Sequence, residues 1–466
     1  MVTYLRNFLQ PINRLPPEVL ALCAAFVPDT GTGPRPLILL THVCRYWREA
    51  ITSSPGTWAR ISSRWKRYAP FCLEHARAAP LSVEISSQEI QGDKDFIQAL
   101  IPHTSKISHL SVTGYSSVRN FVDDHPDFLK SPMPHLTSLE FQRTGEPAEL
   151  FPRGQNPLTP LFQHGVKLKS LHLTGVPLFR TQRDISSLVE LTLACYTATP
   201  RELLGFLESN PALEIVDLDL KFTGPSVTAL RMVSLPRLRS LALSCEEPPD
   251  AGGFLSCLSI TSCMNISIEG KRCADLATFL PDPPTPIQHV LTPITIAKYT
   301  HTKPRLHLLG PGGSFSFSSR QTASWELLKS FSPFVIGTIR EVHLDVGAVI
   351  LEDQLPKLLQ QLPALEALAF CSICFYYSSL SALKRKPILC PSLKTIAFLN
   401  CRVDGEIIKM LEEAAAARKN STATPLYRVV IVSSEGGLPV FKQFQKLQGF
   451  VPCVDARLGS KLPDLL

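Results

Sequence analysis

A short pattern of apolar and polar positions recurs along most of the chain. It has the form apolar-x-x-apolar-x-apolar, and successive copies begin about 20 to 33 residues apart, with one interval of 76 residues between Cys263 and Ile339. Internal repeats at such intervals are typical of proteins that stack one structural unit many times. The copies begin at Ile107, Leu136, Leu168, Leu188, Leu213, Leu238, Cys263, Ile339, Leu365, Leu393 and Leu426.

Each copy predicts one short β-strand. Its last two apolar residues alternate with polar ones, so they share one face of an extended segment. Stretches with helical spacing lie between copies, for example residues 199–213 and 351–365. One strand and one helix cannot bury their apolar sides alone, whereas stacked units can. The sequence therefore predicts an α/β fold with parallel strands on one face and helices on the other.

The interval of 76 residues interrupts this regularity. Its first part is rich in proline and predicts an irregular insertion at about residues 275–325. Within it, alternation on both sides of Gly310-Pro311-Gly312-Gly313 predicts a hairpin or an irregular coil. These glycines do not form a phosphate-binding loop, because no Gly-Lys-Ser/Thr follows them.

The repeat resembles the leucine-rich-repeat family, whose units form a solenoid. That family places Asn or Cys three positions after the last strand leucine, where it ties the turn backbone together. Only Cys401 fits this rule here, so the resemblance implies an irregular solenoid. The alternative is an ordinary α/β domain with leucine-rich strands. The corresponding positions are Thr144, Val176, Tyr196, Lys221, Glu246, Gly347, Ile373 and Cys401.

Ahead of the repeats, residues 12–61 predict a small helical head. Pro17 suits the first turn of a helix, because the backbone N–H that proline lacks would have no helical acceptor there. Glu18 suits it as well, because a negative charge interacts favourably with the positive end of the helix dipole. Pro28 and Gly31 end this helix. An apolar face with the spacing i, i+3, i+4 and i+7 runs along it and consists of Val19, Leu22, Cys23 and Phe26.

A second helix is predicted from about Pro36 to Ser53. Two adjacent apolar stripes cover nearly half of its circumference, where a surface helix of a small domain normally shows one narrower stripe. The second stripe therefore needs another cover, either the repeats or another protein. Pro55 ends the helix, and Trp58 lies on a short return. The stripes comprise Leu37, Leu40, Cys44, Trp47 and Ile51, and beside them Leu39, Val43, Tyr46 and Ala50.

Charge and cysteine content narrow the classes of function. The net charge is +7; residues 1–80 hold ten Lys/Arg against four Asp/Glu, or +6, and the remaining residues hold 37 against 36, or +1. A basic head on a neutral body favours an acidic partner for the head over nucleic acid for the whole chain. Thirteen scattered cysteines and the absence of a signal-peptide pattern predict an intracellular protein, in the cytoplasm, the nucleus or both.

Neither a membrane nor a nucleic acid is expected as a partner. The uncharged segment Ala367–Leu383 is 17 residues long, slightly short for a membrane span, and it opens with the strand pattern. Basic and aromatic side chains alternate in one segment and could stack on bases, but a solvated linker surface is the simpler interpretation. That segment holds Arg60, Arg64, Trp65, Lys66, Arg67 and Tyr68.

The head resembles the F-box family, especially the form common in large fungal families of F-box proteins. The helix over residues 68–78 and the strand after Pro80 resemble the usual entry into the repeats. The layout then comprises an N-terminal extension (1–11), a three-helix F-box (12–61), a linking helix (62–80) and a leucine-rich-repeat-like solenoid (81–466). The matching motifs are Leu15-Pro16-Pro17-Glu18-Val19, Val43-Cys44-Arg45-Tyr46-Trp47-Arg48 and Ser54-Pro55-Gly56-Thr57-Trp58-Ala59-Arg60-Ile61.

This resemblance implies the substrate-recognition subunit of an SCF-type E3 ubiquitin ligase. The F-box docks on an acidic Skp-type adaptor, which binds a cullin, and the solenoid captures a protein substrate. The alternative is a leucine-rich-repeat scaffold or binding protein whose head is only a cap. Plain core packing is the other interpretation of the motif residues. By motif position, the resemblance implies adaptor contacts from Leu15, Pro16, Val19, Leu22, Val43, Cys44, Trp47 and Trp58.

Catalytic chemistry is not indicated, and we expect no enzyme activity, no cofactor and no metal. No nucleophile elbow, HExxH motif or phosphate loop is present. A hydrolase of unrecognised type would require titratable groups clustered in one cleft. Cys371-x-x-Cys374 has no histidine nearby, and cysteines after a strand are more often small core residues than zinc ligands.

Strand positions that face away from the predicted core outline a substrate surface. They change along the chain from polar to small and apolar residues. Small side chains in the C-terminal repeats leave room for an inserted side chain or a small ligand. The predicted substrate-binding positions are Glu140, His172, Thr192, Asp217, His343, Ala369 and Ala397.

Overall fold

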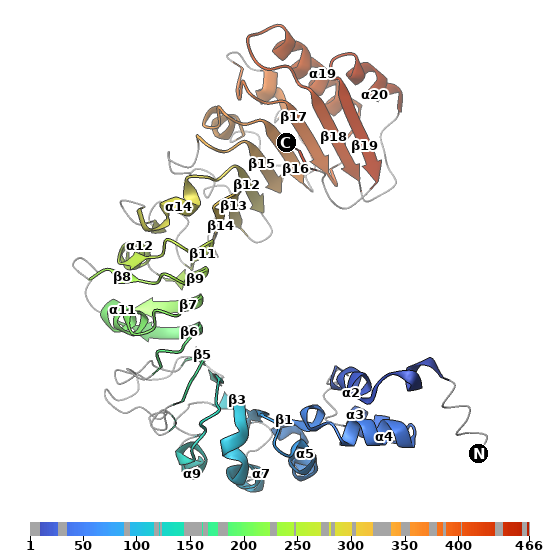
Figure 1. The fold of residues 1–466 in the computed structure, drawn as a ribbon. Coiled ribbons are helices and arrows are strands. Elements are labelled where there is room, and N and C mark those ends of the chain that lie inside the picture. Colours follow the sequence, from blue (N-terminus) through green and yellow to red (C-terminus); the bar gives the residue numbers. More distant parts are fainter. Residues whose placement is uncertain are drawn as a thin grey trace. The chain divides into compact units, whose positions relative to one another are not determined.

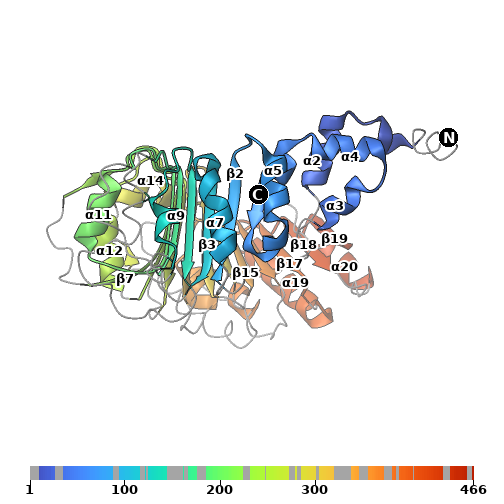
Figure 2. The same cartoon turned by 90° about the horizontal axis from the view of Figure 1, so that it is seen from below.

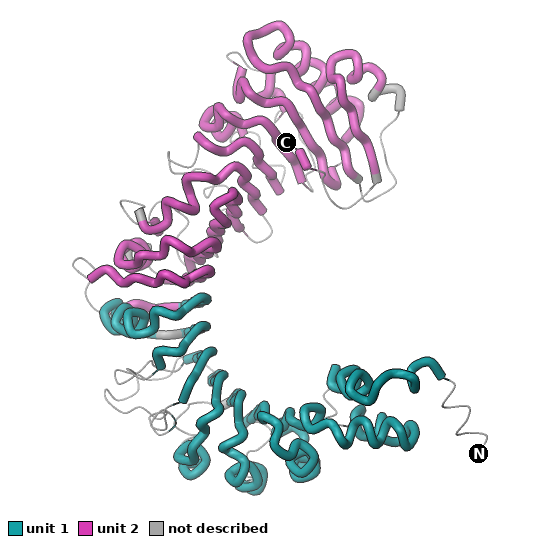
Figure 3. The backbone as a smooth tube through the Cα atoms, viewed as in Figure 1, with its two compact units in different colours: residues 1–219 teal, residues 220–466 magenta. Residues whose placement is uncertain are grey.

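The computed structural model divides into two compact units, residues 1–219 and 220–466 (Figure 3). Within each unit, the helices lie along one side of the strands (Figures 1 and 2). The structure describes residues 10–26, 35–87, 94–115, 121, 124–143, 161, 166–175, 185–223, 231–246, 248–271, 279–280, 285–300, 304–319, 337–345, 355–371, 380–384, 388–401, 403–433, 441–458 and 464–465.

The head of the first unit consists of short helices, in which α2 packs against α3 and α4. Pro17 occupies the first turn of α2 as predicted, where its missing N–H leaves no helix bond unmade. The elements are η1 (Pro11–Arg14), α2 (Pro17–Ala25), α3 (Arg35–Thr41), α4 (Arg45–Thr52) and η2 (Pro55–Trp58).

The predicted continuous helix over residues 36–53 is wrong, because the chain breaks between α3 and α4. Cys44 is extended, with φ −160° and ψ 175°, so the helical path stops there. Thr41 turns its hydroxyl back onto the Ile38 carbonyl at 2.6 Å, a local bond that competes with helix continuation. The Arg48 guanidinium donates to the Thr41 carbonyl at 3.1 Å and joins the two helices across the corner. Each apolar stripe is therefore split between two helices.

Trp58 lies in the interior and is 1% exposed. Its indole N–H donates to the Ile51 carbonyl at 2.9 Å. Its ring meets that of Phe71 edge-on, with centroids 5.1 Å apart, which joins the head to α5 (Ala69–Ala76). The adaptor contact implied for Trp58 is corrected accordingly: the side chain has no exposed surface to offer a partner and serves as core.

The strands of the first unit follow one another in chain order and pair in parallel from β1 to β6. The backbone N–H groups of Glu214 and Ile215 both donate to the Val189 carbonyl, which places β7 beside the start of β6. The strands are β1 (Arg60–Ser62), β2 (Leu81–Ser86), β3 (Ile107–Tyr115), β4 (Ser138–Arg143), β5 (Ser170–Thr174), β6 (Glu190–Ala198) and β7 (Ile215–Phe222).

Helical segments connect these strands and cover one face of the sheet (Figure 2). The helix predicted within residues 199–213 is confirmed as α11, where the side chains of Thr199 and Glu202 form a reciprocal capping box. Besides α5, the connections are η3 (Ser63–Tyr68), α7 (Lys94–Leu100), η4 (Ile101–Lys106), α9 (Pro126–Lys130) and α11 (Pro200–Glu208).

The repeat motif is confirmed as the core of the strands. Its residues, from Ile107 in the first copy to Ile431 in the last, are 3% exposed or less. Equivalent residues stack across the sheet, so that Leu139 pairs with both Leu110 and Leu171. Each such side chain contributes about 1.5–3 kcal/mol when it is buried. The result is an α/β, mostly parallel architecture consistent with a solenoid-like repeat.

In the second unit, the sheet order is β9, β11, β14, β13, β12, β15, β16, β17, β18, β19. A separate pair joins β8 (Val233–Ser234) to β10 (Leu258–Ser259). The remaining strands are β9 (Ser240–Cys245), β11 (Asn265–Gly270), β12 (Ile296–Thr300), β13 (Arg305–Gly310), β14 (Gly313–Ser319), β15 (Glu341–Asp345), β16 (Ala367–Cys371), β17 (Thr395–Leu399), β18 (Arg428–Ser433) and β19 (Cys453–Leu458). The labelled helices are α12 (Pro248–Ser256), η5 (Thr285–Ile287), α14 (Gln288–Leu291), η6 (Ala382–Lys384), α19 (Gly405–Lys419) and α20 (Phe441–Gln448), and residues 355–360 are helical as well.

The predicted irregular insertion contains three strands that enter the sheet. β14 is parallel to β11 and β12 is parallel to β15, while β13 is antiparallel to both of its neighbours. The hairpin alternative is confirmed, since Gly310 pairs with Gly313. Gly313 has φ 131°, and a Cβ at this position would lie 1.9 Å from the Met264 carbonyl oxygen, so only glycine fits. The description of this segment as an insertion loop is therefore too simple.

Within the described ranges, no helix is both long and apolar enough to cross a membrane. The uncharged segment considered for that role begins as β16, and its residues 372–379 lie outside the described part of the chain. Among the described His, Cys, Asp and Glu side chains, no group of three is placed to hold a metal ion. Cys374 of the Cys-x-x-Cys pair also lies outside the described residues.

Candidate functional site

The first helix of the head carries exposed apolar side chains along one side. Val19, Leu22 and Phe26 are 41%, 59% and 78% exposed, although they form the apolar face recognised in the sequence. Their spacing of i, i+3 and i+7 places them along one side of the helix. The buried side of α2 carries a smaller set, Leu20, Ala21 and Ala24.

Further apolar side chains of the head are exposed, among them Ile12 in η1, which is 48% exposed. Leu39 on α3 is 58% exposed, and Val43 in the turn that follows is 52% exposed. We refer to Val19, Leu22, Phe26, Leu39 and Val43 as the exposed apolar set. Single exposed apolar residues are common on protein surfaces, but their concentration in one small helical segment is typical of a protein-interaction site.

The other residues implied as adaptor contacts hold the start of the head together. The Trp47 indole N–H donates to the Asn13 side-chain oxygen at 2.5 Å, and the Tyr46 hydroxyl donates to the Leu15 carbonyl. Both bonds fasten the segment before α2 onto α4. Pro16 is exposed, and half-buried positions are taken by Leu15, Cys44 and Trp47.

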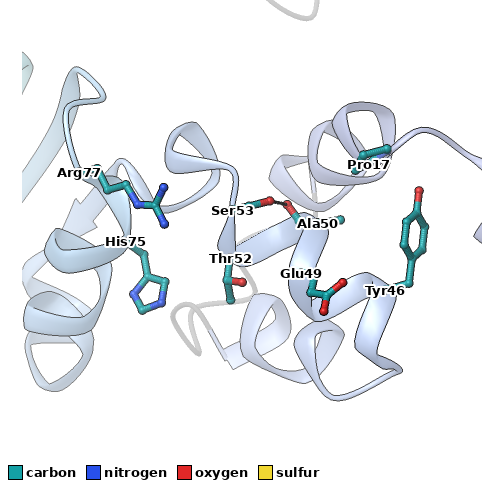
Figure 4. A pocket seen from close by; sticks show the side chains of 8 residues that line it. All are labelled: Pro17, Tyr46, Glu49, Ala50, Thr52, Ser53, His75 and Arg77. Carbon is teal, nitrogen blue, oxygen red and sulfur yellow. Dashed lines mark hydrogen bonds between the residues drawn. The ribbon is translucent and has the colours of Figure 1, made fainter.

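A pocket of about 470 Å³ lies where α2, α4 and α5 approach one another (Figure 4). Its hydroxyl groups are directed at backbone carbonyls: Thr52 donates to Arg48 and Ser53 donates to Ala50. The His75 ring pairs with a carbonyl of its own helix. No hydroxyl is therefore bonded to a base among these lining residues, and the pocket lacks the arrangement of an activated nucleophile. The lining comprises Pro17, Tyr46, Glu49, Ala50, Thr52, Ser53, His75 and Arg77.

The sheet of the first unit presents a polar row on the face opposite its helices, which we call the helix-free face. Glu140 pairs with His172, and His172 pairs with Thr192, so three of the predicted substrate positions lie side by side. His172 Nδ1 lies 3.9 Å from Glu140 Oε1, which also accepts from the Gln142 amide at 2.5 Å. Asp217 is exposed on β7. Acidic and hydrogen-bonding groups therefore dominate this row.

In the second unit, the corresponding row begins with Ala242, Ser267 and Ser316 and then reaches a lysine and two histidines. Lys298 pairs with both His307 and His343 across the sheet. His343 is bonded to the Glu341 carboxylate of its own strand. Burial lowers the pKa of His307, and the nearby Lys298 and Arg305 lower it further. Sequence analysis missed Lys298 and His307, because their segment was interpreted as an insertion; the alternation around His307 was the available signal.

The last part of this row is small, apolar and covered. Ala369 and Ala397 are both 0% exposed, which corrects their prediction as an open substrate surface. Leu465, from a segment far along the chain, packs in the same cluster and is itself 3% exposed. The expected room for an inserted side chain is real, but a residue of the protein itself occupies it. Nothing in the local sequence of Leu465 indicates this docking, because it depends on a contact distant in the chain.

Cys390 is buried and Cys371 is half-buried at the end of β16. Burial raises the pKa of Cys371 to about 12, with smaller contributions from Cys401 and Asp345. Burial likewise raises the pKa of Cys390 to about 12. At neutral pH both groups are thiols rather than thiolates, and the thiolate is the form that attacks electrophiles and binds metals.

Alkylation of the native chain at pH 8 with iodoacetamide is expected to modify Cys23 and Cys195 first, because both are exposed. Cys371 and Cys390 should remain unmodified until denaturant unfolds the chain, since their thiolate form is suppressed. Mass mapping of tryptic peptides after short exposures measures this order. Labelling of Cys390 as fast as Cys23 would contradict it.

Comparison with known proteins gives only distant structural similarity. No protein-family model and no curated protein matches the sequence. Among solved structures, a chain of the Rad7 and Elc1 complex in yeast is 13% identical, with a TM-score of 0.31, 86% of this chain covered and 92% of that chain. A protein from Bacteroides fragilis is 10% identical, with a TM-score of 0.18 and coverages of 84% and 78%.

Proposed function

We propose that this chain is the substrate-recruiting subunit of an SCF-type ubiquitin ligase. The helical head docks on an acidic Skp-type adaptor, the adaptor links it to a cullin, and the strand-and-helix repeats capture a protein substrate. The chain itself catalyses no reaction. The observation that carries the proposal is the exposed apolar set, which leaves Val19, Leu22 and Phe26 outside while Leu20, Ala21 and Ala24 fill the interior.

Energetics support docking at this surface. Full burial of one Leu, Val or Phe side chain contributes about 1.5–3 kcal/mol, and association itself costs roughly 4–15 kcal/mol. A partner that covers all five residues gains enough to offset much of this cost, and a few central residues normally dominate such interfaces. Three of these five residues, Val19, Leu22 and Val43, are also positions at which the F-box resemblance implies adaptor contacts.

Charge supports an acidic partner. The first eighty residues hold six more basic than acidic side chains. Complementary charge raises association rates and disfavours wrong partners more than it adds affinity. The exposed Arg45–Glu49 pair at 2.7 Å does not change this excess, because Glu49 is already counted in it.

The repeats support the capture role by offering different chemistry in the two units. In the first unit, the helix-free face presents Glu140 and His172 to solvent at side-chain exposures of 26% and 37%. In the second unit, basic residues precede a small apolar cluster. Different side chains at equivalent strand positions can select different substrates while the backbone of the repeats stays the same.

A capping role for the head is the second candidate. It is favoured by Trp58, whose packing on Phe71 makes the head continuous with the first connecting helix. A β1 strand that follows η2 directly also pairs with β2 of the repeats. A pure cap, however, requires no large apolar side chains at its outer surface.

Co-expression of the full chain with a Skp-type adaptor distinguishes the two candidates. The ligase role predicts a stable complex of equal proportions on size-exclusion chromatography, with an association rate that falls as salt is raised. A head that serves only as a cap predicts that the two proteins elute separately at micromolar concentrations. The latter result would overturn the proposal.

A further inference from the structure

Strands β16, β17 and β18 are apolar on both faces. β16 and β17 each bury four consecutive residues, whereas β4 and β5 of the first unit alternate between buried and partly exposed positions. Continuous apolar runs are typical of strands that are covered on both sides. Helices cover one side here, so the helix-free face needs a cover of its own. Its apolar residues, which we call the small-residue site, are Ala367, Ala369, Ala397, Val430 and Val432.

Leu465 lies on this site. Among the described members of the cluster, it alone comes from outside the three strands. Its backbone carbonyl accepts from the Thr395 hydroxyl at 3.3 Å, and the Asp464 carbonyl accepts from the Arg428 guanidinium at 2.9 Å. The segment is therefore held by one inserted aliphatic side chain and by two bonds to its backbone.

These contacts have the character of peptide recognition. Hydrogen bonds to backbone carbonyls are available to any peptide, so they contribute affinity, while the shape of the site selects the side chain. Alanines at three of its five positions leave space above the sheet that a leucine-sized group fills. At the rim, Asp455 lies 3.8 Å from Arg428 and 3.7 Å from Arg457, which leaves one net positive charge beside the inserted leucine.

We propose that the small-residue site binds an extended protein segment that presents a leucine-sized aliphatic side chain, and that the segment carrying Leu465 is its displaceable occupant. The net positive rim favours an acidic residue beside the leucine, the place that Asp464 takes. This inference rests on the proposed substrate capture and makes it specific, because substrate and resident segment then compete for one site. A tethered competitor acts at an effective concentration of about millimolar.

The test uses the full chain and a fluorescein-labelled peptide of residues 460–466, SKLPDLL. Leu465→Asp in the chain should release the resident segment and open the site. Fluorescence anisotropy should then show saturable peptide binding, at least about tenfold tighter than to the wild-type chain, whose own segment competes. Leu465→Ala is a milder version and should give a smaller gain in the same direction.

Two controls locate the binding. A peptide with Asp in place of Leu465 should not bind the Leu465→Asp chain. Adding Ala397→Phe to that chain should abolish binding of the natural peptide, because the new ring fills the small-residue site. Far-UV circular dichroism confirms that each variant is folded. Equal binding by the wild-type, Leu465→Ala and Leu465→Asp chains, or binding insensitive to Ala397→Phe, would overturn the inference and make Leu465 a permanent part of the core.

The outcome is independent of the ligase proposal. No adaptor is present in the binding assay, so a failed peptide experiment leaves docking of the head intact. Conversely, a chain that binds the peptide but no Skp-type adaptor retains the peptide site and loses the ubiquitin role.

Discussion

Leu22→Asp combined with Phe26→Asp is expected to lower the affinity for a Skp-type adaptor by at least about 100-fold. The two side chains are 59% and 78% exposed in the free head, so the substitution costs the isolated chain little. In a complex, each aspartate loses an apolar contribution of about 1.5–3 kcal/mol and places a carboxylate in an apolar interface. A 100-fold loss corresponds to about 2.8 kcal/mol, which lies at the low end of that sum. Calorimetric titration or biolayer interferometry measures the change.

A matched control separates the loss of a docking site from a general effect of charge. Met232→Asp combined with Tyr427→Asp introduces the same two carboxylates at side chains that are 60% and 61% exposed, far from the head in sequence. This variant should bind the adaptor like the wild type. If both double variants bind the adaptor as tightly as the wild type, α2 is not part of the interface. If both lose affinity to the same extent, the effect of the added charge is non-specific.

Trp58→Ala is expected to destabilise the chain by about 3–5 kcal/mol, because it removes a side chain that is only 1% exposed. The change leaves a cavity beside Phe71 and removes the donor to the Ile51 carbonyl. Urea unfolding followed by far-UV circular dichroism should show the loss as a lower midpoint for the transition that includes the head. Trp58→Phe should recover part of it, since the ring packing is kept and only the N–H is lost.

Trp47→Ala is the matched comparison, because Trp47 is half-buried and donates to a side chain rather than to a buried carbonyl. Its effect on the unfolding midpoint should be smaller. Adaptor affinity then decides the role of Trp58: under conditions where the protein is folded, Trp58→Phe should bind like the wild type. An unchanged midpoint together with lost adaptor binding would make Trp58 a direct contact after all.

The strand core was predictable because it depends on local alternation. Leu110, Leu139 and Leu171 are each buried and paired in register, since a two-residue period leaves one face to fill and every neighbouring copy fills it in the same way. The same local logic located the turn at Gly313. These features depend on neighbouring residues or on repeated copies of one pattern, so they can be recognised in the sequence itself.

Features that depend on distant partners were missed or placed wrongly. The break at Cys44 follows from local bonds such as that of Thr41, which compete narrowly with helix continuation and leave the apolar spacing unchanged. The exposed side of α2 shows the clear i, i+3 and i+7 apolar spacing. Packing against α4, and not this spacing, determines that the side with Leu20, Ala21 and Ala24 is buried. Leu465 lies 68 positions after Ala397 in the sequence, and no periodicity records a contact between positions so far apart.

The meander formed by β12, β13 and β14 has a consequence for how this protein could gain or lose length. Two reversals of chain direction cancel, so β14 and β12 run the same way as the strands β11 and β15 that they join. Any odd number of consecutive hairpin-linked strands restores direction in this manner, whereas an even number would meet one neighbour head to tail. Such a block can therefore be inserted or deleted between two repeats without reversing the direction of the strands that follow. The sheet can gain strands in its interior as well as at its two ends.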